Sequence, residues 1–483
     1  MAYPNKTILI HRNLFAYSLI LLVYIAFIIP SSPPYSGIGF DREIFQYIGM
    51  IIDHNMVPYT DAFDHKPPVI YLLNYLGFIC TPNSTWGIFI LLNILGFIAA
   101  ILVYKASFLR TKNILLSICI SLIFISLSNL YVFQEGGNLT RQVTAHLTIF
   151  IIYISFFYRT TFWSTLLSGF LLGLIFFTQQ NEVLAPAVIL VSSSLFNREF
   201  DLLPLKKILI HYSFLLLGFI ITCLLFGLLL VFWNNFADFI DQAYLFNFKS
   251  YIKNESYIRK LQNVCQQFFI GYSNVKILLL IWVILLINII RAKKINPSLI
   301  ILLLAFVVQL FSIALSGKIY GHYFLTLIPF LCFILLFSFK QLGSIYIYGI
   351  SVALALLLFV QLRRSLQAVE NDNPIVKEIS REVSNVKNKA GQFYSFTAHY
   401  LRINYELNIT SPSKWVYLKY ANSPYFPAGK MINELLADLK KNKTTYILIH
   451  EYQRPLYPKV NELLELYYKP VLLTNSLILF KKE

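Results

Sequence analysis

The sequence predicts a polytopic α-helical membrane protein with about eleven transmembrane spans and a small C-terminal α/β soluble domain. Apolar residues make up 57% of the 483 residues, charged residues only 13%, and the mean hydropathy is +0.63. A soluble surface needs about a quarter of its residues charged. Residues 1–362 hold only 22 Lys and Arg and 12 Asp and Glu, whereas residues 363–483 hold 18 and 11. We therefore expect a membrane domain over 1–362 and a soluble domain over 363–483.

The predicted spans follow from the length of the apolar runs, because a helix needs about 20 apolar residues to cross a bilayer. The runs close to this length are 14–31, 85–104, 113–133, 143–158, 163–178, 183–197, 208–233, 275–290, 298–315, 322–339 and 343–362. The run Val69–Cys80 has only 12 residues between Pro68 and Pro82. We expect it to form an interfacial or re-entrant helix within a first outer loop over 32–84.

The distribution of basic residues predicts the orientation. With the N-terminus inside, 13 Lys and Arg fall in the inside segments and nine in the outside loops, as the positive-inside rule requires. Arg363 and Arg364, beyond the last span, argue mildly the other way. We expect a multi-pass protein of the plasma (inner) membrane with a cytoplasmic N-terminus and an extracytoplasmic C-terminal domain. The net charge of +17 is then a matter of orientation, and no nucleic-acid partner is expected.

Helix and strand patterns alternate in residues 363–483, which is typical of a small α/β layer domain. The predicted helices are 374–389, 398–407, 430–441 and 459–468. The predicted strands are 392–396, 414–418, 444–450 and 471–480, the last as one or two strands. No Gly-rich phosphate loop follows a strand, so no nucleotide site is expected.

The first outer loop carries the densest group of chemically useful residues. Asp41 and Glu43 follow a Gly-rich turn, and Asp64, His65 and Lys66 precede two prolines. The first proline restrains Lys66 to an extended backbone, and a fixed lysine at the interface suits a lipid phosphate. An aspartate beside such a lysine is what glycosyl transfer from a phosphate-linked donor would require. The alternative is a solvated loop whose charges only anchor it to headgroups.

Three further polar groups fall on the same predicted face. Glu135 and Arg141 flank a Gly-Gly-Asn turn, which alternatively is a structural helix cap. The run 179–182 is Gln-Gln-Asn-Glu, which alternatively is a simple helix connection. Lys318 and His322 stand at a helix start, where the histidine is alternatively an interfacial residue. Because all three groups fall on the same predicted face of the membrane, the functional interpretation of each is strengthened.

The run from Asp41 to Pro68 resembles the first loop of the bacterial protein-mannosyltransferase-like membrane glycosyltransferases, which are relatives of the lipid A aminoarabinose transferase and belong to the GT-C class. The residues that carry this resemblance are Asp41, Phe45, Tyr47, Pro58, Tyr59, Asp61, Asp64, His65, Lys66 and Pro68. GGNLT at 136–140, GHYFLTLIP at 321–329 and the soluble tail are similar to later parts of the family. The chain departs from relatives that carry acidic residues after GGNLT, because Arg141 and Gln142 stand there and Glu135 is the nearest substitute.

The resemblance implies an inverting glycosyltransferase that moves a sugar from a polyprenyl-phosphate donor to an envelope glycan, lipid or protein acceptor on the outer face. Lys66 would neutralise the leaving phosphate, with Arg141 or Lys318 as helpers. Asp41 would accept the proton of the acceptor hydroxyl, directly or through a bound cation. The secondary candidates are Glu43, Asp64, His65, Glu135, Arg141, Lys318 and His322. No cofactor is expected to be required, and a divalent cation would use Asp41 and Glu135.

Two other functions compete with this interpretation. A transporter or flippase of lipid-linked saccharides would carry charges within its spans and internal repeats, but the predicted spans are nearly free of charge and show no convincing repeat. A polymerase or ligase of lipid-linked saccharides would concentrate its functional residues in later loops. The first-loop motif favours the transferase over both.

Overall fold

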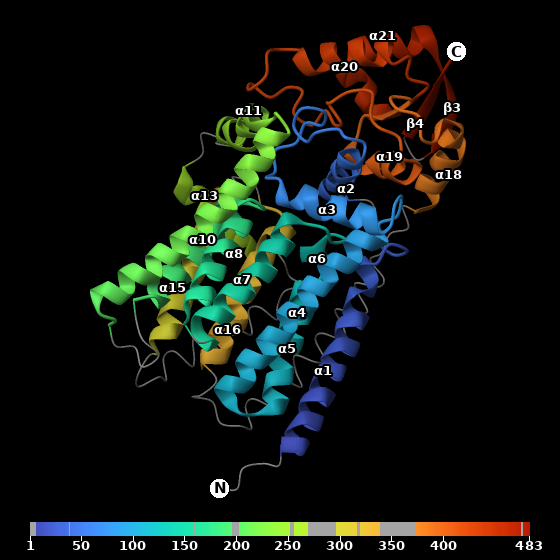
Figure 1. Ribbon diagram of the computed structural model, residues 1–483. Coiled ribbons are helices and arrows are strands. Elements are labelled where there is room, and N and C mark those ends of the chain that lie inside the picture. The colour runs from blue at the N-terminus through green and yellow to red at the C-terminus, as the bar shows by residue number, and fades with distance from the viewer. Residues whose placement is uncertain are drawn as a thin grey trace.

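The computed structural model describes residues 6–37, 39–158, 160–195, 202–251, 256–268, 296–315, 319–338, 373–474 and 477–483. Within these ranges the chain forms a bundle of long helices with a smaller α/β domain at one end (Figure 1). We call that end of the bundle the domain end and the opposite end the far end. The predicted spans 275–290 and 343–362 lie outside the described residues, so the number of about eleven spans stays a prediction.

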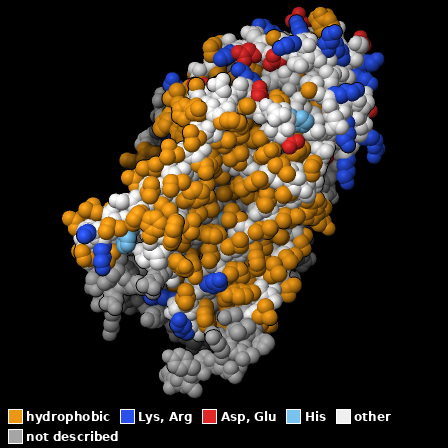
Figure 2. All heavy atoms as spheres, in the orientation of Figure 1, with side chains coloured by type: hydrophobic (Ala, Val, Ile, Leu, Met, Phe, Trp, Pro, Cys, Tyr) orange, Lys and Arg blue, Asp and Glu red, His pale blue; other side chains and the backbone are white. Residues whose placement is uncertain are grey.

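The helices of the bundle correspond to the other predicted spans. They are α1 (Lys6–Ile28), α4 (Trp86–Thr111), α5 (Ile114–Ser128), α7 (Thr140–Phe157), α8 (Phe162–Phe176), α9 (Leu184–Ser193), α10 (Leu205–Phe232), α15 (Pro297–Leu315) and α16 (Ile328–Ser338). Within the described ranges, five segments are long and apolar enough to cross a membrane, namely Leu14–Ser31, Trp86–Thr111, Leu205–Phe232, Pro297–Leu315 and Gly321–Ser338. Figure 2 shows a broad belt of hydrophobic side chains over the bundle, with most visible charges on the α/β domain. Because such a belt must be covered by lipid, the chain is a membrane protein.

Helix α10 illustrates how a span divides its surface between protein and lipid. Its buried residues are Gly218, Thr222, Phe226 and Leu230, which recur every four positions and so lie on one face. That face packs against α8, and the Thr222 hydroxyl donates a hydrogen bond to the Phe170 carbonyl at 3.1 Å. Its leucines outside this stripe are largely exposed, as expected for a helix with one protein-facing side.

Short elements connect the bundle helices. They are η1 (Ile29–Ser31), α2 (Phe40–Asp53), α3 (Val69–Cys80), α6 (Tyr131–Gln134), η2 (Gln180–Val183), α11 (Phe236–Phe239), η3 (Ile240–Leu245), α12 (Phe246–Tyr251), α13 (Tyr257–Gln266) and η6 (Gly321–Leu327). Helix α3 has the bounds that its flanking prolines predict, and at 12 residues it is too short to span a bilayer. It packs along α2, and the two helices form the floor on which the α/β domain rests (Figure 1).

The α/β domain confirms most of the predicted alternation. Its elements are α18 (Asn373–Val383), η8 (Ser384–Val386), β1 (Phe393–Ser395), η9 (Ala398–Tyr400), α19 (Leu401–Leu407), α20 (Lys430–Lys441), β2 (Tyr446–His450), η10 (Glu451–Leu456), α21 (Pro458–Tyr467), β3 (Tyr468–Thr474) and β4 (Leu477–Lys482). The sheet order is β1-β2-β4-β3, with β1 and β2 parallel and the other pairs antiparallel. The region predicted as one or two strands over 471–480 forms the β3–β4 hairpin.

The predicted strand at 414–418 is wrong. These residues form an irregular segment without strand pairing, in which the Val416 N–H donates to the Lys414 carbonyl at 2.9 Å and four of the five side chains are buried. Their alternating aromatic pattern does not serve a sheet, because Trp415 and Tyr417 pack against Phe63 of the first loop, with ring centroids 5.2 and 6.0 Å away. The Phe63 backbone N–H also donates to the Lys414 carbonyl at 2.8 Å. The segment therefore joins the α/β domain to the first loop.

Candidate active site

A cavity of about 270 Å³ lies where the first loop, the domain end of the bundle and the α/β domain meet. Its lining residues come from sequence positions far apart: Gly39, Phe40, Asp41, Arg42, His65, Lys66, Glu135, Leu139, Tyr320, His322, Tyr323, His399, Lys419 and Tyr420. Five of the residues predicted from the sequence therefore share one cavity, namely Asp41, His65, Lys66, Glu135 and His322.

Asp41 and Glu43 occupy the first turn of α2, where a helix dipole favours acidic side chains. Two positions along a helix differ by about 200° in direction, so the two carboxylates point to opposite sides. Asp41 is partly exposed and lines the cavity. Glu43 is completely buried and forms an ion pair with Arg42 at 2.8 Å. The structure thus places Asp41 at the cavity and Glu43 outside its lining.

Asp64 is a buried carboxylate that links the first loop to the α/β domain. It accepts hydrogen bonds from the hydroxyls of Tyr71 at 2.6 Å and Tyr417 at 2.9 Å, and it lies 3.2 Å from His65 Nδ1. Burial alone would raise the pKa of Asp64, but its hydrogen bond and charge interaction with His65, together with Tyr71 and Lys66, lower that pKa to about 2. Asp64 does not line the cavity but orients His65, which does.

Burial lowers the pKa of His65 below its ordinary value, against the opposing effect of Asp64. At neutral pH the pair is therefore an ionised Asp64 and a neutral imidazole, with Nδ1 3.2 Å from the carboxylate. This arrangement fixes the ring orientation, as carboxylate partners of histidines do elsewhere. His65 thus contributes a rigid, uncharged wall to the cavity.

Lys66 is held by its backbone. The Tyr59 hydroxyl donates to the Lys66 carbonyl at 2.8 Å, and Asn247 Nδ2 donates to the preceding His65 carbonyl at 2.9 Å. The Lys66 side chain lines the cavity and is only 9% exposed. Among the described residues, no carboxylate lies within ion-pair distance of its ammonium group. Burying a lysine ammonium group without an anionic partner costs free energy. An anion bound in the cavity would therefore be stabilised by Lys66.

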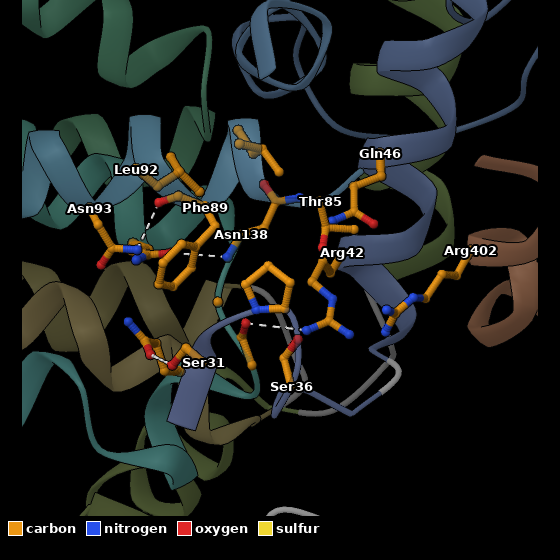
Figure 3. A pocket seen from close by; sticks show the side chains of 16 residues that line it. Ser31, Ser36, Arg42, Gln46, Thr85, Phe89, Leu92, Asn93, Asn138 and Arg402 are labelled. Atoms are coloured by element: carbon orange, nitrogen blue, oxygen red, sulfur yellow. Dashed lines mark hydrogen bonds between the residues drawn. The ribbon is translucent and has the colours of Figure 1, made fainter. Parts of the chain in front are cut away.

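The Gly-Gly-Asn turn has a run of four residues with positive φ, from Glu135 through Asn138. Gly136 and Gly137, at φ 87° and 85°, accommodate this left-handed path at low cost. Arg42 lines a small pocket beside the turn (Figure 3). Its guanidinium donates a hydrogen bond of 3.2 Å to the Gly136 carbonyl. The turn thereby presents Glu135 to the cavity, where its carboxylate lies 3.0 Å from His322 Nδ1. The predicted structural cap is thus also a wall of the cavity.

Arg141 does not line the cavity, although the sequence suggested it as a helper for the phosphate. It is 1% exposed and pairs with Glu182 at 2.9 Å. Glu182 also accepts a hydrogen bond from Gln309, which in turn donates to Thr326 at 2.8 Å. The guanidinium lies 3.1 Å from the ring centroid of Tyr323, which does line the cavity. Arg141 and Glu182 therefore form a buried network that supports the cavity wall.

The GHYFLTLIP motif forms η6 and the start of α16. A Cβ atom at Gly321 would lie 2.0 Å from the Val132 carbonyl, so only glycine permits this close approach to α6. The contact brings Tyr320, His322 and Tyr323 to the cavity. Lys318, the other predicted helper, lies outside the described residues.

The α/β domain supplies three cavity residues that sequence reasoning missed: His399, Lys419 and Tyr420. Lys419 Nζ lies 4.3 Å from the ring centroid of Phe40 on α2. The Tyr420 ring lies 5.6 Å from that of His65. The only signal in the sequence was the unusual density of aromatic residues over 415–426. Such residues predict a buried segment but do not show which other segment covers it.

A metal site needs several ligating side chains close together. In the part of the chain that the structure describes, no three His, Cys, Asp or Glu residues gather closely enough to hold a metal ion. Asp41 and Glu135 share the cavity, but Glu135 already pairs with His322. The described side chains thus do not form a ready set of metal ligands.

No protein-family model matches the chain, and no curated protein matches its sequence. Solved structures match its fold. ArnT from Cupriavidus metallidurans in the apo state matches with a TM-score of 0.67 at 11% identity, over 96% of this chain and 97% of that chain. ArnT bound to undecaprenyl phosphate matches with a TM-score of 0.62 at the same identity and coverage. The apo oligosaccharyltransferase of Archaeoglobus fulgidus matches with a TM-score of 0.50 at 11% identity, over 91% of this chain and 70% of that chain. The chain therefore shares its fold with ArnT over nearly the whole length of both chains, as the resemblance of its first loop predicts.

Proposed function

We propose that the protein is an inverting glycosyltransferase that moves a sugar from a polyprenyl-phosphate donor to an acceptor on the outer face of the plasma membrane. The observation that carries this proposal is Lys66, a buried ammonium group without a carboxylate partner among the described residues, in the same cavity as Asp41. A cation prepared for an anion beside a carboxylate suits a reaction whose leaving group is a phosphate. The fold shared with ArnT, which was solved with undecaprenyl phosphate, supports a lipid-linked donor.

The proposed reaction uses the cavity residues in one displacement. The acceptor hydroxyl oxygen attacks the anomeric carbon, and the bond from that carbon to the phosphate oxygen breaks. The electron pair of the broken bond stays on the phosphate, whose added charge Lys66 neutralises. The acceptor proton passes to the Asp41 carboxylate. The products are the glycosylated acceptor and the polyprenyl phosphate, and attack from the opposite side inverts the anomeric carbon.

The α/β domain is proposed to contact the acceptor. It contributes Lys419, His399 and Tyr420 to the cavity, where they lie beside the first loop. Aromatic rings at Tyr320 and Tyr420 provide flat apolar faces for a sugar ring, while Lys419 provides a positive charge near the rim, where it is exposed. An acceptor with sugar and anionic groups fits this wall, and an envelope glycan, lipid or glycosylated protein offers both.

The proposal requires no cofactor, because the sugar–phosphate bond supplies the driving force and the described side chains supply the charges. A divalent cation between Asp41 and Glu135 is the alternative means of charge neutralisation. A transporter or flippase fits less well, since transporters place their sites near the bilayer midplane and this cavity lies at the domain end of the bundle.

The proposal is tested by mass spectrometry of envelope glycans, lipids and glycoproteins from cells with and without the gene. We expect loss of one sugar substituent, restored by the wild-type gene but not by an Asp41→Asn variant expressed at the same level. An unchanged envelope, together with no release of undecaprenyl phosphate from a panel of undecaprenyl-phosphate hexoses and pentoses, would contradict it.

A further inference from the structure

A second cavity, of about 700 Å³, lies at the far end of the bundle. It is lined by Leu109, Arg110, Ile154, Ser155, Phe156, Phe157, Tyr158, Thr160, Ser164, Thr165, Ser168, Leu190, Ser193, Ser194, Leu203, Lys207, His211, Leu215, Ser298 and Phe337. Helix α7 connects the two sites, because Leu139 precedes its first residue and Phe157 is its last. Its 18 residues span about 27 Å, close to the thickness of a hydrocarbon core.

The charged side chains that line this far-end cavity are all basic. Arg110, Lys207 and His211 contribute basic groups, and none of the described lining residues is acidic. Serine and threonine hydroxyls surround them, from α7, α8, α9 and the start of α15. Lys and Arg side chains are visible at this end of the hydrophobic belt in Figure 2. Most of these hydroxyls donate to backbone carbonyls of the preceding turn, so the basic groups are the main phosphate-binding feature of the lining.

Three buried polar atoms around the far-end cavity are available to bind a ligand. Arg110 Nε, Ser155 Oγ and His211 Nδ1 have no hydrogen-bond partner among the described residues. They come from α4, α7 and α10, so their convergence is not a property of one helix. Buried donors without partners are costly, and a phosphate oxygen would satisfy each of them.

We propose that the far-end cavity binds the phosphate of an anionic glycerophospholipid. The apolar part of the lining favours a lipid over free phosphate, because Phe157 and Leu215 would contact an acyl chain or glycerol backbone and would gain nothing from a free anion. Arg110 itself lies over the Phe337 ring at 4.8 Å, which joins the basic and apolar parts of the wall. This site is separate from the proposed transferase reaction and does not depend on it.

Lys206 and Lys207 provide a matched pair for the test. Both are exposed and adjacent on α10, but only Lys207 lines the far-end cavity. The full-length protein, purified in a neutral detergent, is examined by native mass spectrometry after addition of phosphatidylglycerol or phosphatidylcholine. We expect phosphatidylglycerol to be retained at least fivefold more than phosphatidylcholine. Lys207→Ala and Arg110→Gln should each abolish this preference, whereas Lys206→Ala should leave it intact.

Two outcomes would overturn the proposal. Equal loss of phosphatidylglycerol in Lys206→Ala and Lys207→Ala would show attraction to a basic surface rather than binding in the cavity. Displacement of the lipid by millimolar inorganic phosphate, with the same thermal protection from phosphate alone, would identify a free-anion site instead. Melting curves of each variant accompany the spectra, and the Lys207→Ala result decides the matter if Arg110→Gln fails to fold.

Discussion

The comparison of Asp41 with Glu43 tests the proposed chemistry most directly. The perturbations are Asp41→Asn and Glu43→Gln, each of which replaces a carboxylate by an amide of the same shape. The two residues share the first turn of α2, but Asp41 lines the active-site cavity and Glu43 is buried against Arg42. One change therefore removes the proposed base, and the other removes a structural ion pair.

Asp41→Asn should mainly lower turnover, whereas Glu43→Gln should mainly lower folding stability. Loss of a general base lowers turnover by about 10²–10⁴, so kcat of Asp41→Asn should fall by at least two orders of magnitude. Its KM for the donor should stay within about threefold, because Lys66 is unchanged and KM reports donor binding here when chemistry is slow. Glu43→Gln should cost about 1–3 kcal/mol of folding stability. Arg42 keeps its hydrogen bonds to the Gly37 and Gly136 carbonyls, so kcat of the folded fraction should stay within about fivefold.

The assay uses protein in nanodiscs with synthetic undecaprenyl-phosphate sugars and an envelope extract as the acceptor source. Release of undecaprenyl phosphate is followed by liquid chromatography and mass spectrometry, and melting temperatures are measured on the same samples. Near-normal transfer by Asp41→Asn, together with an inactive but well-folded Glu43→Gln, would refute the assignment of the base.

The other predictions concern donor, topology, pH and metal. Lys66→Ala should weaken binding of undecaprenyl phosphate at least tenfold in a thermal-shift titration, whereas Lys414→Ala, outside the cavity, should not. A phosphatase reporter fused after Glu483 should be active only outside the cytoplasm, and cytoplasmic activity would reverse the proposed orientation. Thermal stability should fall as the pH drops from about 7 to about 5. The reason is that the folded-state pKa of His65 lies below its ordinary 6.5, so the unfolded chain binds more protons than the folded chain in this range. The variant His65→Gln should show a smaller loss of stability over the same pH range. EDTA should leave transfer within about twofold, and a full loss restored by Mg²⁺ or Mn²⁺ would favour the cation alternative.

Local signals made much of the fold predictable from the sequence. The prolines at 68 and 82 set the bounds of α3, and the 3.6-residue pattern over 430–441 gave α20. The strand predicted at 414–418 failed because alternating aromatic residues indicate one buried face of a strand but do not show what covers that face. In the folded chain Trp415 and Tyr417 meet Phe63 and Asp64, some 350 positions earlier in the sequence.

The candidate site was predictable only in part, for the same reason. Asp41, His65 and Lys66 stand in one polar loop, so their proximity follows from local sequence. Arg141 was expected to help Lys66, but its charge is neutralised by Glu182 from another helical segment. Lys419 carries no motif at all, and only the docking of the α/β domain brings it to the cavity. Pairings across long stretches of chain are decided by packing, which a single sequence does not display.

The walls of the active-site cavity come from residues as far apart as Asp41 and Tyr420. During synthesis the first loop is made long before residues 399–420, which close the cavity. The cavity therefore cannot form on a chain that lacks these residues, nor before they have reached the side of the membrane where Lys66 lies. Synthesis of both segments and their arrival on one side of the membrane are thus conditions for the proposed activity.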